Sequence, residues 1–323
     1  MKKIALLTSG GDAPGMNAAV RAITRAAIYR GLEVVAFYRG FRGLVEGDCI
    51  NLRTEHVSNI IQRGGTILLT ARCEEFFHKA GRAAAYANLT KEGIDGLIVV
   101  GGNGTLQGAL LLSEEFNFPV VGVPATIDND LFGTSLSLGY TTALNTIVDA
   151  VDKIRDTASS HERIFFVEVM GRHSGFLALN AAIASGCEAA LVPEVLDDVS
   201  ALEAMYEKGI RKTKTSSIVL VAEGEEEGGA IEISRRFRAK FPHFEVRYTI
   251  LGHIQRGGIP CATDRILGGR FGLAAVEALL AGHSQVMVAD NNGDITLVPF
   301  QEAISTKSTL SSDLFNLLRI LSI

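Results

Sequence analysis

The chain has 323 residues, of which 47% are hydrophobic and 21% charged, and it carries a formal net charge of −5 at pH 7. This length accommodates two α/β lobes or one large one, and the apolar content argues against a disordered chain. An acidic chain without tryptophan lacks both the positive field and the stacking side chains of a nucleic-acid-binding protein. We therefore expect its phosphate-bearing ligands to be small molecules.

The sequence also indicates a cytoplasmic protein that does not bind membranes. No uninterrupted apolar run approaches the roughly 20 residues of a membrane span, and the run at 4–7 is too short for the core of a signal peptide. The four cysteines are scattered along the chain without a CxxC pair. We expect reduced thiols, with neither a disulfide framework nor a zinc site.

Short β-branched runs alternate with longer helical patterns along the chain. We expect strands at 4–7, 34–38, 97–100, 120–123, 164–169, 218–222 and 246–250. We expect helices at 16–30, 82–92, 106–116, 141–159, 176–185, 201–212, 231–240 and 266–281. Strands separated by helices of about 10–15 residues indicate βαβ units and a largely parallel sheet, and the Asn-Asn-Gly-Asp run at 291–294 indicates a late hairpin.

Two glycine pairs follow predicted strands and precede predicted helices. Gly10-Gly11 follows the first strand, and Gly101-Gly102 follows the strand at 97–100. In an open α/β sheet ligands bind at the carboxyl ends of the strands, and a loop without side chains before a helix lets amide groups approach phosphate oxygens. The first loop has neither the dinucleotide nor the Walker pattern. The two loops predict polyphosphate binding, and a plain tight turn is the alternative for the first loop taken alone.

A third segment, 124–130, carries two carboxylates in a predicted loop. Asp128 and Asp130 are two positions apart, so they could hold Mg²⁺, or one could be a general base that the other orients. Paired acids are equally typical of a plain turn. Several arginines stand beside predicted strands, where a bidentate guanidinium is a natural phosphate ligand: Arg72, Arg163, Arg172, Arg247 and Arg256, the last close to His253.

Several segments, in collinear order, resemble bacterial 6-phosphofructokinases. They are TSGGDAPGMNAAVR (8–21), RGGT (63–66), PATIDND (124–130), SSHERI (159–164), VEVMGRHSG (167–175) and LGHIQRGG (251–258). The resemblance covers about residues 1–290, and three of these motifs are specific. It implies ATP-dependent phosphorylation of fructose 6-phosphate to fructose 1,6-bisphosphate, the committed step of glycolysis, with Mg²⁺ as metal.

The resemblance also implies a fold and an assembly. The expected fold is α/β and two-lobed, each lobe having a mainly parallel sheet flanked by helices. Residues 1–139 with about 252–302 would form the ATP-binding lobe, and residues 140–251 with about 303–323 the lobe that binds fructose 6-phosphate. The family forms homotetramers, so we expect one here.

Individual residues receive roles from the same resemblance. Asp128 would be the general base, with Thr126 and Asp130 beside it, while Arg72 and Arg172 would neutralise the transferring phosphoryl group. The residues implied in ATP binding are Gly11, Arg72, Cys73, Gly102, Asn103, Gly104 and Thr105. Besides Thr126, Asp128 and Arg172, those implied in binding the sugar phosphate are Met170, Gly171, Glu223, His253 and Arg256, with Arg163 and Arg247 reaching from a neighbouring subunit.

Some positions depart from the family pattern. Asn103 stands where the family usually has the aspartate associated with Mg²⁺, so we expect altered Mg²⁺ dependence; the alternative is a weakly active or non-catalytic regulatory subunit. Pyrophosphate-dependent relatives have aspartate at the position of Gly104 and lysine at that of Ala125, so the small residues here favour ATP over pyrophosphate. Phe41 replaces a tyrosine often found near the adenine.

The resemblance implies, finally, a pocket for an anionic effector such as ADP or phosphoenolpyruvate. The residues that match it are Arg21, Arg25, Arg155, Glu188, Lys212 and Lys214. Thr54, Asn59 and Ser216 replace an arginine, an aspartate and a histidine of that pocket. The identity of the effector therefore stays open.

Overall fold

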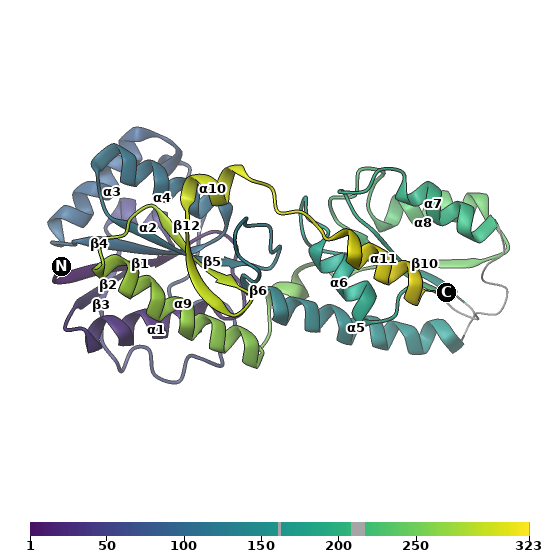
Figure 1. The fold of residues 1–323 in the computed structure, drawn as a ribbon, viewed down its shortest axis with the longest axis horizontal. Coiled ribbons are helices and arrows are strands. Elements are labelled where there is room, and N and C mark those ends of the chain that lie inside the picture. Colours follow the sequence, from purple (N-terminus) through teal and green to yellow (C-terminus); the bar gives the residue numbers. More distant parts are fainter. Residues whose placement is uncertain (161–162, 208–216, 323) are drawn as a thin grey trace. The chain divides into compact units, whose positions relative to one another are not determined.

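The computed structural model describes residues 1–160, 163–207 and 217–322. The chain forms two compact units, each with its own sheet (Figure 1). Unit 1 comprises Met1–Thr142 and Arg256–Ser308, and unit 2 comprises Ala143–Gln255 and Thr309–Ile323. From the sequence we expected the chain to pass from one lobe to the other near residues 139, 251 and 302, and the two units here change after Thr142, Gln255 and Ser308. The ligand assigned to each lobe stays a prediction.

The sheet of unit 1 is mainly parallel. Its strands are β1 (Lys3–Thr8), β2 (Glu33–Phe37), β3 (Cys49–Leu52), β4 (Gly96–Gly101), β5 (Val120–Thr126), β6 (Leu138–Gly139), β11 (Val286–Asn291) and β12 (Asp294–Pro299). They follow the order β12-β11-β5-β4-β1-β2-β3, with β6 paired to β5. Only the β2–β3 and β11–β12 pairs are antiparallel among the described strands of this sheet. The β11–β12 pair confirms the predicted late hairpin.

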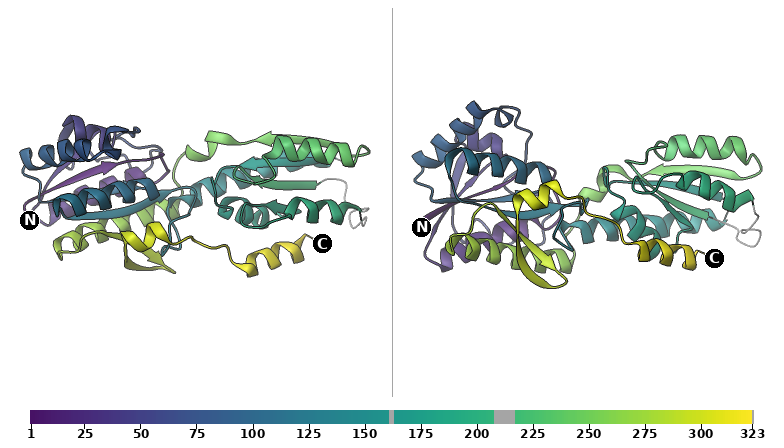
Figure 2. Two further views of the ribbon diagram at one scale, coloured as in Figure 1. Left: turned by 90° about the horizontal axis from the view of Figure 1, so that it is seen from above. Right: turned by 45° about the horizontal axis from the view of Figure 1, so that its top comes forward.

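Helices cover both faces of this sheet (Figures 1 and 2). They are α1 (Met16–Tyr29), α2 (Phe41–Glu46), α3 (Lys79–Lys91), α4 (Asn103–Phe116), α9 (Ala262–Leu280) and α10 (Phe300–Ser305), with a 3-10 turn, η1 (Glu75–Phe77). Helices α1 and α9 lie together on one face. A Cβ on Gly268 of α9 would come within 2.9 Å of the Ala18 Cβ, and one on Gly272 would come within 2.6 Å of the Ala22 Cβ. Glycine at these two positions therefore permits the close packing of the helices.

The sheet of unit 2 is entirely parallel in its described strands. Its strands are β7 (Arg163–Val169), β8 (Ala189–Leu191), β9 (Ser217–Ala222) and β10 (Glu245–Ile250), in the order β10-β7-β9-β8. Its helices are α5 (Tyr140–Ser160), α6 (Phe176–Ala184), α7 (Asp198–Glu207), α8 (Ala230–Lys240) and α11 (Ser312–Leu321). A 3-10 turn, η2 (Gly252–Arg256), follows β10 and ends at the first residue of the second segment of unit 1. Together the two sheets confirm the predicted α/β class.

Buried aromatic rings form the core between this sheet and the helices α7 and α8. Phe237 meets Phe166 and Tyr206 at ring-centroid distances of 5.4 Å and 4.9 Å. The expected helix at 201–212 begins at Asp198, and its last residues lie outside the described ones. No helix in the described part of the chain is both long and apolar enough to cross a membrane.

Candidate active site

The three loops singled out in the sequence follow neighbouring strands of unit 1. In the parallel register, Thr8 of β1 pairs with Val100 of β4, and Gly101 pairs with Pro124 of β5. Because β5, β4 and β1 are adjacent and parallel, their carboxyl ends share one edge of the sheet. The glycine loops and the segment 126–130 therefore follow adjacent strand ends at this edge, the position that the sequence predicted for the two glycine loops.

Glycine is required sterically where these loops meet. A Cβ on Gly101 would lie 2.4 Å from the Thr105 hydroxyl and 2.5 Å from the carbonyl oxygen of Ser9. On Gly102 it would lie 3.4 Å from the Thr126 Cβ, an ordinary van der Waals contact, so the steric requirement applies to Gly101. The backbone of each loop thus forms a surface without side chains, of the kind that lets amide groups approach a phosphate.

The second glycine loop leads directly into α4. This helix begins at Asn103, and the exposed residues Asn103 and Gly104 form its first turn, whereas Thr105 is buried. A Cβ on Gly104 would meet no atom of the described residues within 4 Å. The start of a helix favours an anion through its amide groups and dipole, so this turn suits a phosphate chain.

Asp128 stands beside these loops in a buried position. Asp128 is 3% exposed, and its amide donates a hydrogen bond to the Thr126 hydroxyl at 3.2 Å. Asp130 is half-buried. A carboxylate sheltered from water next to a phosphate-binding loop can serve as a general base.

Arg256 approaches the first glycine loop closely. Its Nη1 lies 3.4 Å from the carbonyl oxygen of Asp12, a residue 244 positions away in the sequence. A Cβ on Gly11 would lie only 2.0 Å from this nitrogen. Sequence reasoning assigned Gly11 to ATP and Arg256 to the sugar phosphate, and the structure brings the two into contact.

The segment RGGT (63–66) is fastened to the same loop region. Asn17, which is buried, donates to the carbonyl oxygens of Arg63 and Gly64 at 3.1 Å and 3.3 Å and accepts from the Ile67 amide at 2.8 Å. A Cβ on Gly64 would lie 2.4 Å from the carbonyl oxygen of Gly258. Asn17 was not assigned a role from the sequence, although it belongs to the first motif.

Arg72 and Cys73 lie shortly before the turn η1, separated from it by Glu74. Arg72 is exposed, and burial raises the pKa of the half-buried Cys73 thiol. The turn is held by Arg82, which is buried, pairs with both carboxylate oxygens of Glu115 at 2.8 Å and 2.7 Å, and donates to carbonyl oxygens of η1. Sequence reasoning missed Arg82, because only folding brings these partners together.

Phe41, expected near the adenine, is packed against another ring. It is buried and stacks on Phe76 of η1 with a centroid distance of 3.9 Å. A Cβ on Gly108 of α4 would come within 3.0 Å of Phe41 and 3.1 Å of Phe76. The two rings therefore lie against the backbone of the helix that begins at Asn103.

In unit 2, two loops meet at the carboxyl ends of β7 and β9. The Arg172 amide donates to the Glu223 carboxylate at 2.8 Å, and both Gly171 and Arg172 have positive φ, 141° and 52°. A Cβ on Gly224 would lie 1.7 Å from the Arg172 carbonyl oxygen. The structure thus brings together Gly171, Arg172 and Glu223, three of the residues expected to bind the sugar phosphate.

A fully buried glutamine adds the loop of His253 to this group. The Gln255 side chain accepts from the Met170 amide at 3.0 Å and donates to the Gly252 carbonyl oxygen at 2.9 Å. His253 lies within the turn that Gln255 holds. Gln255 was missed as a supporting residue, although the GHIQRGG motif contains it.

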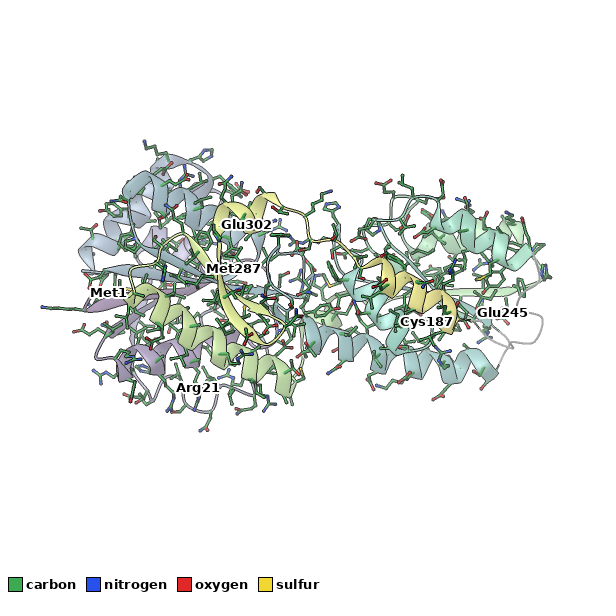
Figure 3. The ribbon with its side chains drawn as sticks, in the orientation of Figure 1. Met1, Arg21, Cys187, Glu245, Met287 and Glu302 are labelled. Atoms are coloured by element: carbon green, nitrogen blue, oxygen red, sulfur yellow. The ribbon has the colours of Figure 1, made fainter. Side chains whose placement is uncertain are left out.

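Arg163 and Arg247 lie in unit 2 as well, but away from the loops of Gly171 and Glu223. Both pair with one oxygen of Glu245, Arg163 through Nε at 2.9 Å and Arg247 through Nη2 at 2.5 Å. Glu245, labelled in Figure 3, is the first residue of β10, as Arg163 is of β7. Met170 follows the other end of β7, about 23 Å away at about 3.3 Å per residue.

The residues matched to an effector pocket are divided between the units. Arg21, labelled in Figure 3, and Arg25 lie on α1 of unit 1. In unit 2, Arg155 donates to the Ser185 carbonyl oxygen at 2.6 Å, and the buried Glu188 accepts from the Ile218 amide at 2.5 Å. Lys212, Lys214 and Ser216 lie outside the described residues.

Comparison with known proteins identifies the family. The phosphofructokinase family model matches residues 3–279. The chain belongs to the phosphofructokinase family. One relative is named ATP-dependent 6-phosphofructokinase 2 of Bacteroides thetaiotaomicron and is 57% identical over 100% of this chain and 99% of its own. Another is named ATP-dependent 6-phosphofructokinase 1 of Thermus thermophilus and is 52% identical over 100% of both chains.

Solved phosphofructokinase structures have the same fold. A phosphofructokinase from Saccharomyces cerevisiae matches with a TM-score of 0.90 and 35% identity, covering 100% of this chain and 48% of its own. A pyrophosphate-dependent phosphofructokinase from Nitrosospira multiformis matches with a TM-score of 0.87 at 19% identity, over 99% of this chain and 91% of its own. At that identity the second likeness concerns the fold alone.

Proposed function

We propose that this phosphofructokinase family member transfers the γ-phosphoryl group of ATP to the 1-hydroxyl of fructose 6-phosphate, giving fructose 1,6-bisphosphate and ADP. The observation that carries the proposal is the buried Asp128 beside two glycine loops at one sheet edge. The names of the whole-chain relatives support the choice of donor and acceptor. The proposal places the reaction in glycolysis and in the cytoplasm.

In the proposed reaction the protein supplies positioning, charge neutralisation and a base. Phosphoryl transfer needs these more than covalent help. Asp128 accepts the proton of the 1-hydroxyl as its oxygen attacks the γ-phosphorus, and the bond to the β-phosphate oxygen breaks. Arg72 and Arg172 stabilise the negative charge on the transferring group, and the glycine loops receive the phosphate chain.

ATP is proposed as the donor in preference to pyrophosphate. Gly104 lies in open space at the start of α4, and Ala125 ends a buried run of β5. Pyrophosphate-dependent relatives have larger charged residues at these two positions. Small side chains leave room for the α-phosphate of a nucleotide, which a pyrophosphate donor lacks.

Mg²⁺ is proposed to accompany ATP. In residues 1–160, 163–207 and 217–322, no group of three or more His, Cys, Asp and Glu side chains could hold a metal. Nucleotide-bound Mg²⁺ needs fewer protein ligands, because phosphates and water supply the others. We assign Asn103, at the start of α4, to this ion, which would neutralise phosphate charge.

The proposed assembly is a homotetramer, and the position of Arg163 and Arg247 supports the sharing of sites between its subunits. One sugar phosphate is too short to contact both Met170 and Arg163, because about 23 Å of β7 separates them. We therefore assign Arg163 and Arg247 to the 6-phosphate bound in a neighbouring subunit. We also propose an anionic effector, for which the matched residues are Arg21, Arg25, Arg155, Glu188, Lys212 and Lys214.

The proposed function is tested by a coupled assay with fructose 6-phosphate. ATP and pyrophosphate are compared as donors, each over a Mg²⁺ titration, and the product is identified as fructose 1,6-bisphosphate. We expect turnover that requires Mg²⁺ and prefers ATP. Preference for pyrophosphate would overturn the donor assignment, and turnover with neither donor would favour a non-catalytic sugar-phosphate-binding subunit.

Replacing Asn103 with aspartate tests the proposed metal site. We expect Asn103→Asp to lower the Mg²⁺ concentration for half-maximal rate about tenfold and to leave the KM for fructose 6-phosphate unchanged. An acidic residue in the first turn of α4 also interacts favourably with the helix dipole, so the melting temperature should not fall. Asn117→Asp, an exposed position at the other end of α4, is the matched control. Unchanged Mg²⁺ dependence in Asn103→Asp would remove residue 103 from the metal site.

A further inference from the structure

The segment that carries Asp128 is held by two buried polar side chains. Asn129 and Ser137 are 6% and 0% exposed. The Ser137 amide donates to Asn129 Oδ1 at 2.8 Å, and the Ser137 hydroxyl lies 2.6 Å from the Thr126 carbonyl oxygen and 3.0 Å from Asn129 Oδ1. Ser137 therefore bonds to the chain on both sides of Asp128.

Asn129 also sets the path of the backbone after Asp128. Its φ is 51°, a left-handed conformation that asparagine adopts more readily than most residues with a side chain. Its Nδ2 donates to the Ser135 carbonyl oxygen at 3.1 Å. The same residue thus turns the chain next to Asp128 and fastens that turn to the returning segment.

The returning segment is itself anchored to the sheet. The Ser135 amide donates to the Asp290 carbonyl oxygen at 2.7 Å, and the Asp290 amide donates to the Thr134 hydroxyl at 3.0 Å. Asp290 belongs to β11, which pairs with β5, the strand that leads to Asp128. The hydrogen bonds of Asn129 and Ser137, with those of the segment 134–135 to β11, therefore connect the chain on both sides of Asp128. We call this set of bonds the frame.

We propose that Asn129 and Ser137 are positioning residues, which hold the Asp128 carboxylate where it can take the proton of the sugar hydroxyl. The inference rests on the proposed function, in which Asp128 is the general base. A base acts only within hydrogen-bond reach of the proton that it removes. A displacement of about 1 Å can cost about 10²-fold in rate, so this frame has a kinetic effect beyond stability.

Two substitutions test the effect of the frame on the reaction rate separately from its effect on the stability of the fold. Ser137→Ala removes the hydroxyl but keeps the amide that bonds to Asn129, and Asn129→Gly removes the side chain while allowing the positive φ. We expect each to lower kcat about 10–100-fold, with the KM values for ATP and fructose 6-phosphate within about threefold. Binding is spared because the frame acts through Asp128.

Two matched controls lie at the end of α4 away from the glycine loop. Ser113 is buried, and its hydroxyl donates to the Phe118 carbonyl oxygen at 2.7 Å, while Asn117 has a φ of 49°. Ser113→Ala and Asn117→Gly delete a similar bond and a similar left-handed asparagine. We expect parental kcat in both controls, with a lower melting temperature in Ser113→Ala and a nearly unchanged one in Asn117→Gly, because glycine readily adopts the left-handed conformation at a helix end.

The deciding experiment combines Ser137→Ala with Asp128→Asn and compares single-turnover rates at high enzyme concentration. If Ser137 acts through Asp128, the double variant should be no slower than Asp128→Asn alone. Full additivity of the two losses would overturn the inference, as would parental kcat in both Ser137→Ala and Asn129→Gly. If the parental protein itself does not phosphorylate fructose 6-phosphate, or if Asp128→Asn retains its rate, the proposed function or the base assignment fails, and this inference fails with it.

Discussion

Replacing Asp128 with asparagine is expected to lower kcat by about 10²–10⁴-fold and to leave the KM for fructose 6-phosphate within a few-fold. The amide keeps the size of the side chain but cannot accept the proton of the sugar hydroxyl at neutral pH. Because ground-state binding does not depend on this proton, the loss should appear in the chemical step. Steady-state kinetics with ATP and fructose 6-phosphate measure both constants.

A control for this variant lies at the opposite edge of the same sheet. Asp95 immediately precedes β4 and accepts hydrogen bonds from the amides of Lys2 and Lys3. Asp95→Asn should therefore keep parental kcat, whatever its effect on the melting temperature. An Asp128→Asn protein that retains more than about a tenth of parental kcat would show that Asp128 is not the base.

Replacing Arg163 or Arg247 with alanine is expected to raise the KM for fructose 6-phosphate about 10–100-fold. Each change removes a charge-assisted contact to the 6-phosphate worth about 1.5–3 kcal/mol, and the KM for ATP should stay within a few-fold. Glu245 forms ion pairs with both guanidinium groups and therefore competes with the phosphate. Glu245→Gln should lower the KM for fructose 6-phosphate by a few-fold.

A matched control and a mixing experiment accompany these variants. Arg235 on α8 pairs with Glu232 on the exposed surface of the same unit, so Arg235→Ala should change neither KM. If neighbouring subunits share sites, mixing the Arg163→Ala and Asp128→Asn proteins should restore some activity on subunit exchange. In a mixed assembly some sites then combine the intact Asp128 of one subunit with the intact Arg163 of its neighbour. Demonstrated exchange without restored activity would argue that each subunit has a self-contained site.

The sequence alone predicted the features that depend on local pattern. Alternation of short apolar runs with helical periods indicated the α/β class, and the glycine pairs indicated loops at the carboxyl ends of β1 and β4. These predictions hold because parallel strands joined by helices place their carboxyl ends at one edge. The short strands β3 and β8, of four and three residues, were missed, since they have too few residues to show a period and depend on pairing for their conformation.

Only the tertiary structure decided which distant residues meet. The contact of Arg256 with the loop of Gly11, the pairing of Arg82 with Glu115, and the attachment of Met170 to Gln255 join segments far apart in the sequence. The hydrogen bond of Ser137 to Thr126 spans fewer residues but depends on the path of the loop between them. Such contacts leave no periodic signal, because they are selected by the packing of the folded chain and not by local propensity.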